Sequence, residues 1–260
     1  MAGWHVILLA GQRPGVDPLA SHFGEEWKAL VPVAGRPMLA RCLGTLLATP
    51  GVGAVTILTQ QPEVLLANAQ VSRAAGDPRV RWCRSQSGIA ASVAALAGTD
   101  AAPWPVLVTT ADHPLLRPET VADFLSCAQG CDLAVGVVER QVVHRAFPEN
   151  RRTWLHFRHG SWTGANLFAL NGPAVLDVLH LWAEIEQHRK KGWRLIARFG
   201  PVLLIRALTR TITLAGALDQ AGKRLGARVK PVALDDPLAA VDVDKPGDHA
   251  LAETILGHNG

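Results

Sequence analysis

The first half of the chain alternates short apolar runs, bounded by Gly, Pro and Asp, with longer segments whose apolar positions repeat at helical spacing. Each run has the length of a buried strand, and each longer segment keeps its apolar residues on one face, as a helix packed on a sheet does. This alternation predicts a mostly parallel sheet that helices cover on both faces. Strands are expected over residues 5–10, 52–58, 80–83, 106–110 and 132–138, and helices over residues 37–47, 63–75, 89–96 and 118–128.

The second half departs from this alternation. Two strands are expected at residues 154–158 and 167–170, on either side of a loop. Residues 173–225 have a mostly helical pattern with breaks at Gly192 and at Gly200 and Pro201, before a last strand at 229–234 and a last helix at 246–256. No repeat or low-complexity linker divides the chain. We therefore expect one α/β domain over residues 1–260, with a helical insertion at residues 173–225.

Composition and charge narrow the class of function. Of 260 residues, 48% are hydrophobic and 18% are charged, which excludes a disordered chain and a coiled coil. The formal net charge of +4 suits phosphate-bearing ligands or an acidic membrane surface, but it is too small to predict nucleic-acid binding.

Cysteine usage and the amino terminus bear on the compartment. The four cysteines do not form a zinc motif, and we expect reduced, buried thiols. The amino terminus lacks the basic region of a signal peptide, and the apolar run at residues 6–10 is too short to cross a bilayer. A cytoplasmic protein is expected.

A glycine-bearing loop follows the first predicted strand. Leu9, Ala10, Gly11, Gln12 and Arg13 lead into it, and Lys28 comes later, before a Pro-rich segment at residues 32–39. Backbone N–H groups of such a loop can approach phosphates, and the Arg13 and Lys28 side chains can neutralise them. The loop is neither a dinucleotide fingerprint nor a P-loop, so an ordinary turn is the alternative.

Carboxylates stand at two further places. Asp112 comes directly after the strand at residues 106–110, where open α/β sheets bind ligands, and a carboxylate there can hold Mg²⁺. The alternative is that Asp112 caps the turn before Pro114. Asp242 and Asp244 alternate along an extended segment, so they point to one side and can reach a metal held by Asp112.

Together these motifs resemble the MobA-like nucleotidyltransferase (NTP transferase) family, which has a GT-A-like, Rossmann-type fold. The loop at residues 9–15, Lys28 and residues 32–39 are similar to the family's amino-terminal signature. The resemblance implies that Asp112 and Asp244 are metal ligands, with Asp242 a weaker candidate for the second position. It also places a nucleotide near Ser87, Gly88 and Ser92. The loop sequence and the long connection at residues 16–26 depart from the family pattern.

The resemblance implies an Mg²⁺-dependent transfer of a nucleotidyl group, in which a phosphorylated acceptor attacks the α-phosphorus of an NTP and pyrophosphate leaves. Lys28, Arg13 and Asp112 are the expected catalytic residues. For the acceptor, the resemblance indicates Asn166 and Gly164, and a basic cluster in the sequence adds Arg158. The expected nucleotide contacts are Leu9, Ala10, Gly11, Gln12, Arg13, Lys28, Ser87, Gly88, Ser92 and Asp112.

Several alternatives stay open. CTP is slightly favoured over GTP or UTP, and the acceptor is a phosphorylated small molecule or lipid-headgroup precursor, with molybdopterin as an alternative. A glycosyltransferase of the same fold and a non-catalytic nucleotide-binding module are the other classes. The apolar and basic segment at residues 193–210 fits a core element, a homodimer contact or a weak membrane-surface contact.

Overall fold

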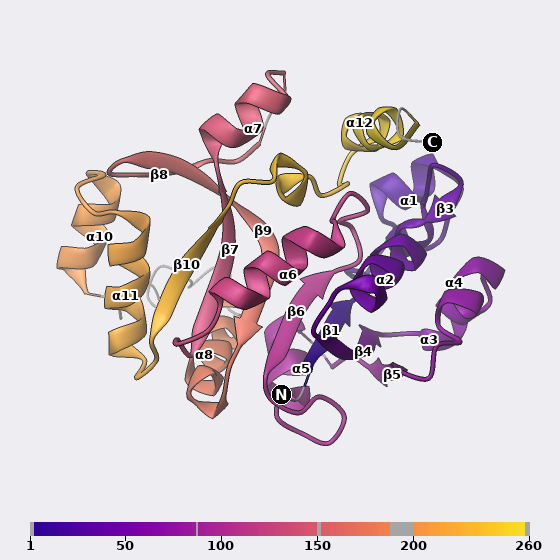
Figure 1. Ribbon diagram of the computed structural model, residues 1–260, viewed down its shortest axis with the longest axis horizontal. Helices are drawn as coiled ribbons and strands as arrows, with labels where there is room; N and C mark the ends of the chain where they lie inside the picture. The colour runs from indigo at the N-terminus through magenta and orange to yellow at the C-terminus, as the bar shows by residue number, and fades with distance from the viewer. Residues whose placement is uncertain (1–2, 87, 150–151, 188–199, 258–260) are drawn as a thin grey trace.

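The computed structural model describes residues 3–86, 88–149, 152–187 and 200–257. Within these residues an eight-stranded sheet has the order β10-β7-β9-β6-β1-β4-β5, with β8 paired to β9 (Figure 1). Strand β9 runs antiparallel to β6 and β7, and the other neighbours on this path are parallel. The prediction of a mostly parallel sheet is confirmed. The strands are β1 (Trp4–Leu9), β4 (Val52–Thr59), β5 (Val80–Arg84), β6 (Val106–Thr110), β7 (Leu133–Glu139), β8 (Leu155–Phe157), β9 (Gly160–Leu170) and β10 (Val229–Leu234).

Helices cover both faces of the sheet. On one face α2 (Met38–Ala48) and α6 (Pro118–Cys127) bury their apolar sides against Val6 and Leu8 of β1. On the other face α5 (Ile89–Leu96) and α8 (Leu176–Gln187) pack around Ile7 of the same strand. Successive strand residues point to opposite faces, so one central strand contributes to both cores. Figure 1 shows α2 and α6 in front of the sheet.

Some predicted elements differ in extent. The single helix expected over residues 63–75 is two, α3 (Pro62–Leu66) and α4 (Ala69–Ala74), because the Asn68 side chain caps the second by accepting from Gln70 N and Val71 N. The loop expected between residues 158 and 167 is strand: β8 and β9 form a hairpin, and β9 already begins at Gly160.

Short elements were missed by the sequence pattern. They contain few apolar residues each, so hydrophobic periodicity does not mark them. They are α1 (Pro18–His22), η1 (Lys28–Leu30), β2 (Pro32–Val33), β3 (Arg36–Pro37), α7 (Arg140–Ala146) and η5 (Pro237–Ala240).

The segment at residues 173–225 contains η2 (Pro173–Val175), α8, α10 (Pro201–Leu208) and α11 (Leu214–Arg224). The expected break at Gly200 precedes α10, whereas the break at Gly192 lies outside the described residues. The last described element is the helix α12 (Pro246–Gly257), where a helix was expected. In the part of the chain that the structure describes, no helix has the length and apolar character needed to cross a membrane.

Candidate active site

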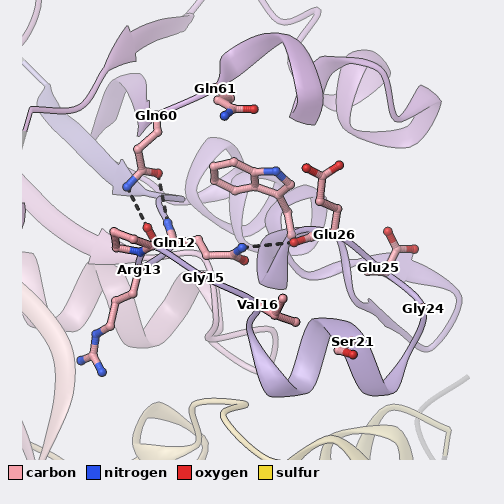
Figure 2. A pocket seen from close by; sticks show the side chains of 12 residues that line it. Gln12, Arg13, Gly15, Val16, Ser21, Gly24, Glu25, Glu26, Gln60 and Gln61 are labelled. Carbon is pink, nitrogen blue, oxygen red and sulfur yellow. Dashed lines mark hydrogen bonds between the residues drawn. The ribbon is translucent and has the colours of Figure 1, made fainter.

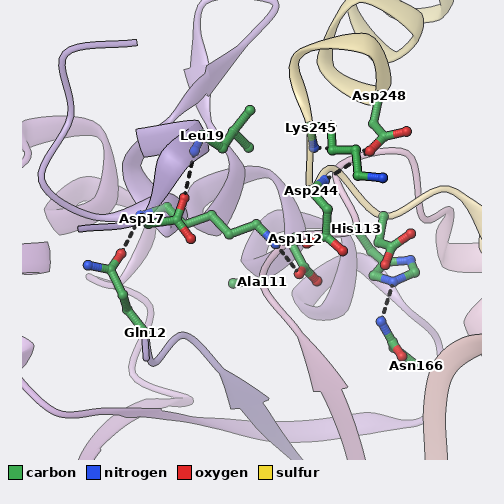
Figure 3. Close-up of polar contacts among 12 residues, drawn as sticks. Gln12, Asp17, Leu19, Ala111, Asp112, His113, Asn166, Asp244, Lys245 and Asp248 are labelled. Atoms are coloured by element: carbon green, nitrogen blue, oxygen red, sulfur yellow. Dashed lines mark hydrogen bonds and ion pairs between the residues drawn. The ribbon is translucent and has the colours of Figure 1, made fainter. Parts of the chain in front are cut away.

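Three charged side chains meet at the carboxyl edge of the sheet. Lys28 Nζ donates to Asp112 Oδ2 at 2.7 Å and also pairs with Asp244 Oδ1. Asp112 follows β6, whereas Asp244 precedes α12, so two distant segments converge on one ammonium group (Figure 3). The side chains of Lys28 and Asp112 are 19% and 23% exposed, and that of Asp244 is 58% exposed. We call Lys28, Asp112 and Asp244 the charged triad.

The backbone brings the carboxyl-terminal segment to β6. Val243 N donates to Asp112 O at 2.9 Å, and Val243 is fully buried. Asp248 then accepts hydrogen bonds from Asp244 N at 3.2 Å and Lys245 N at 3.0 Å, near the start of α12. This carboxylate therefore fixes the turn that carries Asp244, which is the capping role that acidic residues favour at a helix start.

The electrostatics of the triad favour the charged forms. Burial alone lowers the pKa of Lys28, but the charges of Asp112 and Asp244 outweigh it and leave the pKa raised. Burial raises the pKa of Asp112, and the positive charge of Lys28 more than reverses this, so its pKa lies below the ordinary value. Lys28 is therefore an ammonium and Asp112 a carboxylate at neutral pH.

The loop after β1 positions Lys28 through Gln12. Gln12 Oε1 accepts from Lys28 N at 3.0 Å, and Gln12 Nε2 donates to Glu26 O at 3.1 Å. Gln60, directly after β4, binds the backbone of Gln12 at both its N–H and its carbonyl oxygen, at 3.1 and 2.9 Å (Figure 2). These two hydrogen bonds link the loop after β1 to the carboxyl end of β4, the neighbouring strand. Gln60 was missed by the sequence reasoning, although its place at the carboxyl end of a strand is a usable signal.

A cavity of about 570 Å³ opens between this loop and residues 21–27. Glu25 and Glu26 lie on the opposite wall of the cavity, and Figure 2 shows the Arg13 side chain extending away from them. Gly11 lies so close to Gln60 that a β-carbon there would be 2.9 Å from Gln60 Oε1, so a larger residue would displace the Gln60 side chain. The cavity is lined by Gln12, Arg13, Pro14, Gly15, Val16, Ser21, Gly24, Glu25, Glu26, Trp27, Gln60 and Gln61.

A second polar cluster adjoins the triad. Asn166 Nδ2 donates to His113 Nε2 at 2.8 Å, and Arg152 Nη2 pairs with Asp242 Oδ1. Burial lowers the pKa of His113, which keeps its ring neutral. Asp242 is thus engaged by an arginine, while Asp244 belongs to the triad. Arg152 belongs to the same basic cluster of the sequence as Arg158, of which only Arg158 was predicted as an acceptor residue.

The three acceptor candidates lie at different positions along the β8–β9 hairpin. Gly164 and Asn166 are inside β9 rather than before a strand, and Asn166 has φ of 49°, at the bulge where β9 pairs irregularly with β7. Arg158 is exposed at the turn between β8 and β9, where its backbone N–H donates to Ile212 O at 2.9 Å. Of the basic run, it is Arg152 that contacts the cluster around Asp112.

Two of the predicted nucleotide contacts lie at α5: Gly88 directly precedes the helix and Ser92 is within it. Ser92 Oγ donates to Gly88 O at 2.6 Å and accepts from Gln86 N at 2.7 Å, so its hydroxyl group holds the residues that precede the helix. Glu186 of α8 reaches the same place and accepts from Ala90 N at 3.0 Å. Ser87 lies outside the described residues.

The two carboxylates of the triad fit a magnesium ion. Mg²⁺ is commonly bound by one or two carboxylates, completed by water and substrate phosphates. Among the described residues Asp112 Oδ1 is buried without a hydrogen-bond partner, and no group of three or more His, Cys, Asp or Glu side chains forms a metal cage. Asp112 and Asp244 thus supply two carboxylates of the kind that bind Mg²⁺, and phosphate oxygens of a substrate would complete its coordination.

The cysteines have no place in this site. Cys42 is buried and donates to Ala111 O at 3.3 Å, and burial raises its pKa to about 12. Cys131 is also buried, whereas Cys83 is half-buried and Cys127 exposed, so the expectation of buried thiols holds for two of the four.

Comparison with known proteins identifies the family. The family profile described as "MobA-like NTP transferase domain" matches residues 6–227. The chain belongs to this family. It is therefore a nucleotidyltransferase, and the matched range includes Lys28 and Asp112 but ends before Asp242 and Asp244. Comparison with curated proteins gave no significant match.

Solved structures of similar fold agree with this MobA-like assignment. A hypothetical transferase from Thermus thermophilus is 29% identical, with a TM-score of 0.77 over 95% of this chain and 99% of that one. A 4-diphosphocytidyl-2C-methyl-D-erythritol synthase from Anaerococcus prevotii is 10% identical, with a TM-score of 0.58 over 98% and 96%. A CMP:2-keto-3-deoxy-manno-octonic acid synthetase complexed with CTP is 14% identical, with a TM-score of 0.55 over 99% and 100%. The GT-A-like fold is thereby confirmed.

Proposed function

We propose that this MobA-like enzyme transfers a nucleotidyl group from an NTP to a phosphorylated small molecule or lipid-headgroup precursor and releases pyrophosphate. The observation that carries the proposal is the convergence of Lys28, Asp112 and Asp244 at the carboxyl edge of the sheet. Phosphoryl chemistry needs positioning and charge neutralisation more than covalent participation by the protein. A lysine between two carboxylates, beside a glycine-bearing loop, supplies both.

In the proposed reaction an oxygen of the acceptor phosphate forms a bond to the α-phosphorus, and the bond from that phosphorus to the pyrophosphate oxygen breaks. Lys28 and Arg13 neutralise the negative charge that develops on the departing pyrophosphate. Gln12 holds the backbone of Lys28, so the ammonium group is oriented before substrate binds. A bound Mg²⁺, held by Asp112 and Asp244, would polarise the phosphate oxygens.

The acceptor is proposed to bind on the β9 side of the triad. Asn166 and Gly164 lie there, next to the ion pair of Arg152 and Asp242. An acceptor phosphate would replace the Asp242 carboxylate as the partner of Arg152. Arg158 remains an acceptor candidate of the sequence; its exposed place at the hairpin turn gives it no contact with the triad among the described residues. Molybdopterin stays an alternative acceptor.

CTP is the proposed donor. Two proteins of similar fold support this choice: one is a 4-diphosphocytidyl-2C-methyl-D-erythritol synthase, and the other is a synthetase in complex with CTP. Ser87, Gly88 and Ser92 are proposed to contact the base. Leu9, Ala10 and Gly11 are proposed to line the binding site of the phosphates.

Thermal unfolding in the presence of each of the four NTPs, with and without Mg²⁺, tests the proposal. A ligand at about 100 times its Kd stabilises the folded state by about 2.7 kcal/mol, which raises the Tm by roughly 5–10 °C for a domain of this size. We expect such a shift with CTP and Mg²⁺ together, and little with either alone. If no NTP raises the Tm when Mg²⁺ is present, the proposed function is wrong.

A further inference from the structure

Helix α10 and strand β8 expose large apolar side chains on the outside of the molecule. Leu208 is 82% exposed, Val202 65% and Ile205 58% along α10, and Leu155 of β8 is 56% exposed. In contrast, Leu203 on the opposite side of α10 is buried. One side of α10 therefore packs on the protein through Leu203, and the other side leaves its apolar residues exposed. We call Leu155, Val202, Ile205 and Leu208, together with Arg206 and Arg210, the outer patch.

The turn after β8 is joined to the segment that follows α10. Arg158 directly follows β8, and its backbone N–H donates to Ile212 O at 2.9 Å, in the segment between α10 and α11. Ile212 is only 2% exposed, so this junction is packed. Figure 1 shows β8 extending toward α10 at one end of the molecule.

The chain segments that carry the patch are rich in basic residues and lack acidic ones. The sequence has no Asp or Glu between Glu149 and Asp177, and none between Glu186 and Asp219. Within the part of the chain that the structure describes, the exposed side chains of Arg158, Arg206 and Arg210 form no ion pair. Lys28 and Arg152, by comparison, are paired with carboxylates. The patch thus combines protruding apolar side chains with unneutralised positive charge.

We propose that the outer patch docks on an anionic lipid surface. Exposed apolar groups on a soluble protein mark interaction sites, and a helix with apolar residues on one face flanked by arginines suits the headgroup layer of a membrane. The apolar side chains of α10 are exposed in the folded protein, so they can enter that layer without rearranging the fold. Arginines at the margin add attraction to anionic headgroups. This docking does not depend on the proposed reaction.

Vesicle flotation of the full chain tests the docking. We expect binding to vesicles of phosphatidylcholine with phosphatidylglycerol, weaker binding as salt is raised, and little binding to phosphatidylcholine alone. Arg206→Gln should weaken partitioning about fivefold, the effect of one basic residue near an anionic surface. The double variant Ile205→Glu, Leu208→Glu should abolish it. The matched control is Leu66→Glu, since Leu66 is an exposed leucine of α3, outside the patch.

Three results would overturn the proposal. One is the absence of binding to anionic vesicles at low salt. Another is equal binding by the double variant and the Leu66→Glu control. The third is a concentration-dependent dimer, seen by light scattering, that the double variant abolishes, because a second copy of the chain would then be the occupant.

Discussion

Lys28 and Asp112 meet where water reaches each side chain only in part, with exposures of 19% and 23%. Partial burial strengthens their attraction relative to a surface pair, while the desolvation of both groups offsets some of the gain. Asp244 is more open, at 58%, and adds a second negative charge to the same ammonium. Removal of the lysine should therefore leave two carboxylates that repel each other.

The variant Lys28→Met tests this balance. We expect the free energy of unfolding to fall by about 1–2 kcal/mol without divalent cation, less than the roughly 3–5 kcal/mol of a fully buried pair because the three groups are partly hydrated. Mg²⁺ alone should then stabilise the variant more than the wild type, since the cation replaces the missing positive charge. Urea denaturation with and without Mg²⁺ measures both effects.

The control for this prediction is Lys245→Met, which removes an exposed lysine beside Asp244. It should change neither stability nor the response to Mg²⁺. A Lys28→Met protein that is as stable as the wild type and indifferent to Mg²⁺ would show that the two carboxylates do not share one cation.

At the scale of elements, the loop after β1 is a rigid support for Lys28. Gln12→Ala removes the hydrogen bonds to Glu26 O and Lys28 N, and we expect about tenfold weaker NTP binding, with a loss of about 1 kcal/mol in stability. Titration calorimetry measures the binding. Gln61→Ala, which alters an exposed amide lining the same cavity, should bind NTP as the wild type does. Unchanged affinity in Gln12→Ala would contradict this positioning role.

The junction of β1 and β4 should make stability depend on pH. His5 Nε2 donates to Thr56 Oγ1 at 2.8 Å, and burial, with a smaller effect of Arg81, lowers the pKa of His5. The unfolded chain therefore binds more protons below about pH 6.5, its ordinary value. The stabilising contribution is complete above that pH and is lost as the pH falls toward the lower folded pKa.

Denaturation between pH 7 and 5.5 checks this linkage. We expect His5→Gln to flatten part of the slope, while the buried His113 maintains the rest. The exposed His180→Gln should leave the slope as in the wild type. An unchanged slope in His5→Gln would refute the assignment.

The core elements were predictable because their patterns are periodic. Strands β1, β4 and β6 and helices α2, α5 and α6 were predicted from the spacing of apolar residues and from the Gly, Pro and Asp residues that bound them. The antiparallel placement of β9 between β6 and β7 was not predictable, because it depends on tertiary pairing rather than on local pattern. The break at Asn68 depends on a side-chain cap, which periodicity does not reveal.

At the scale of the whole molecule, the parallel strands bring distant residues to one edge. Asp112 was found from sequence because it follows a strand at the edge where open α/β sheets bind ligands, whereas Asp244 was preferred to Asp242 from the family resemblance. The engagement of Asp242 by Arg152 and the clamp between Gln12 and Gln60 were not found, because such contacts exist only after the chain has folded. The sequence therefore indicated the chemistry of the site better than its supporting contacts.

The central claim is that Asp112 takes part in an Mg²⁺-dependent NTP site. Titration calorimetry of CTP in the presence of Mg²⁺, comparing the wild type with Asp112→Asn, tests it most directly. The control is Asp100→Asn, an exposed aspartate that precedes β6 and so lies at the opposite edge of the sheet. We expect Asp112→Asn to weaken binding at least about tenfold and to lose its Mg²⁺ dependence, with the control unchanged. Equal affinity and equal Mg²⁺ dependence in Asp112→Asn and the wild type would contradict the account.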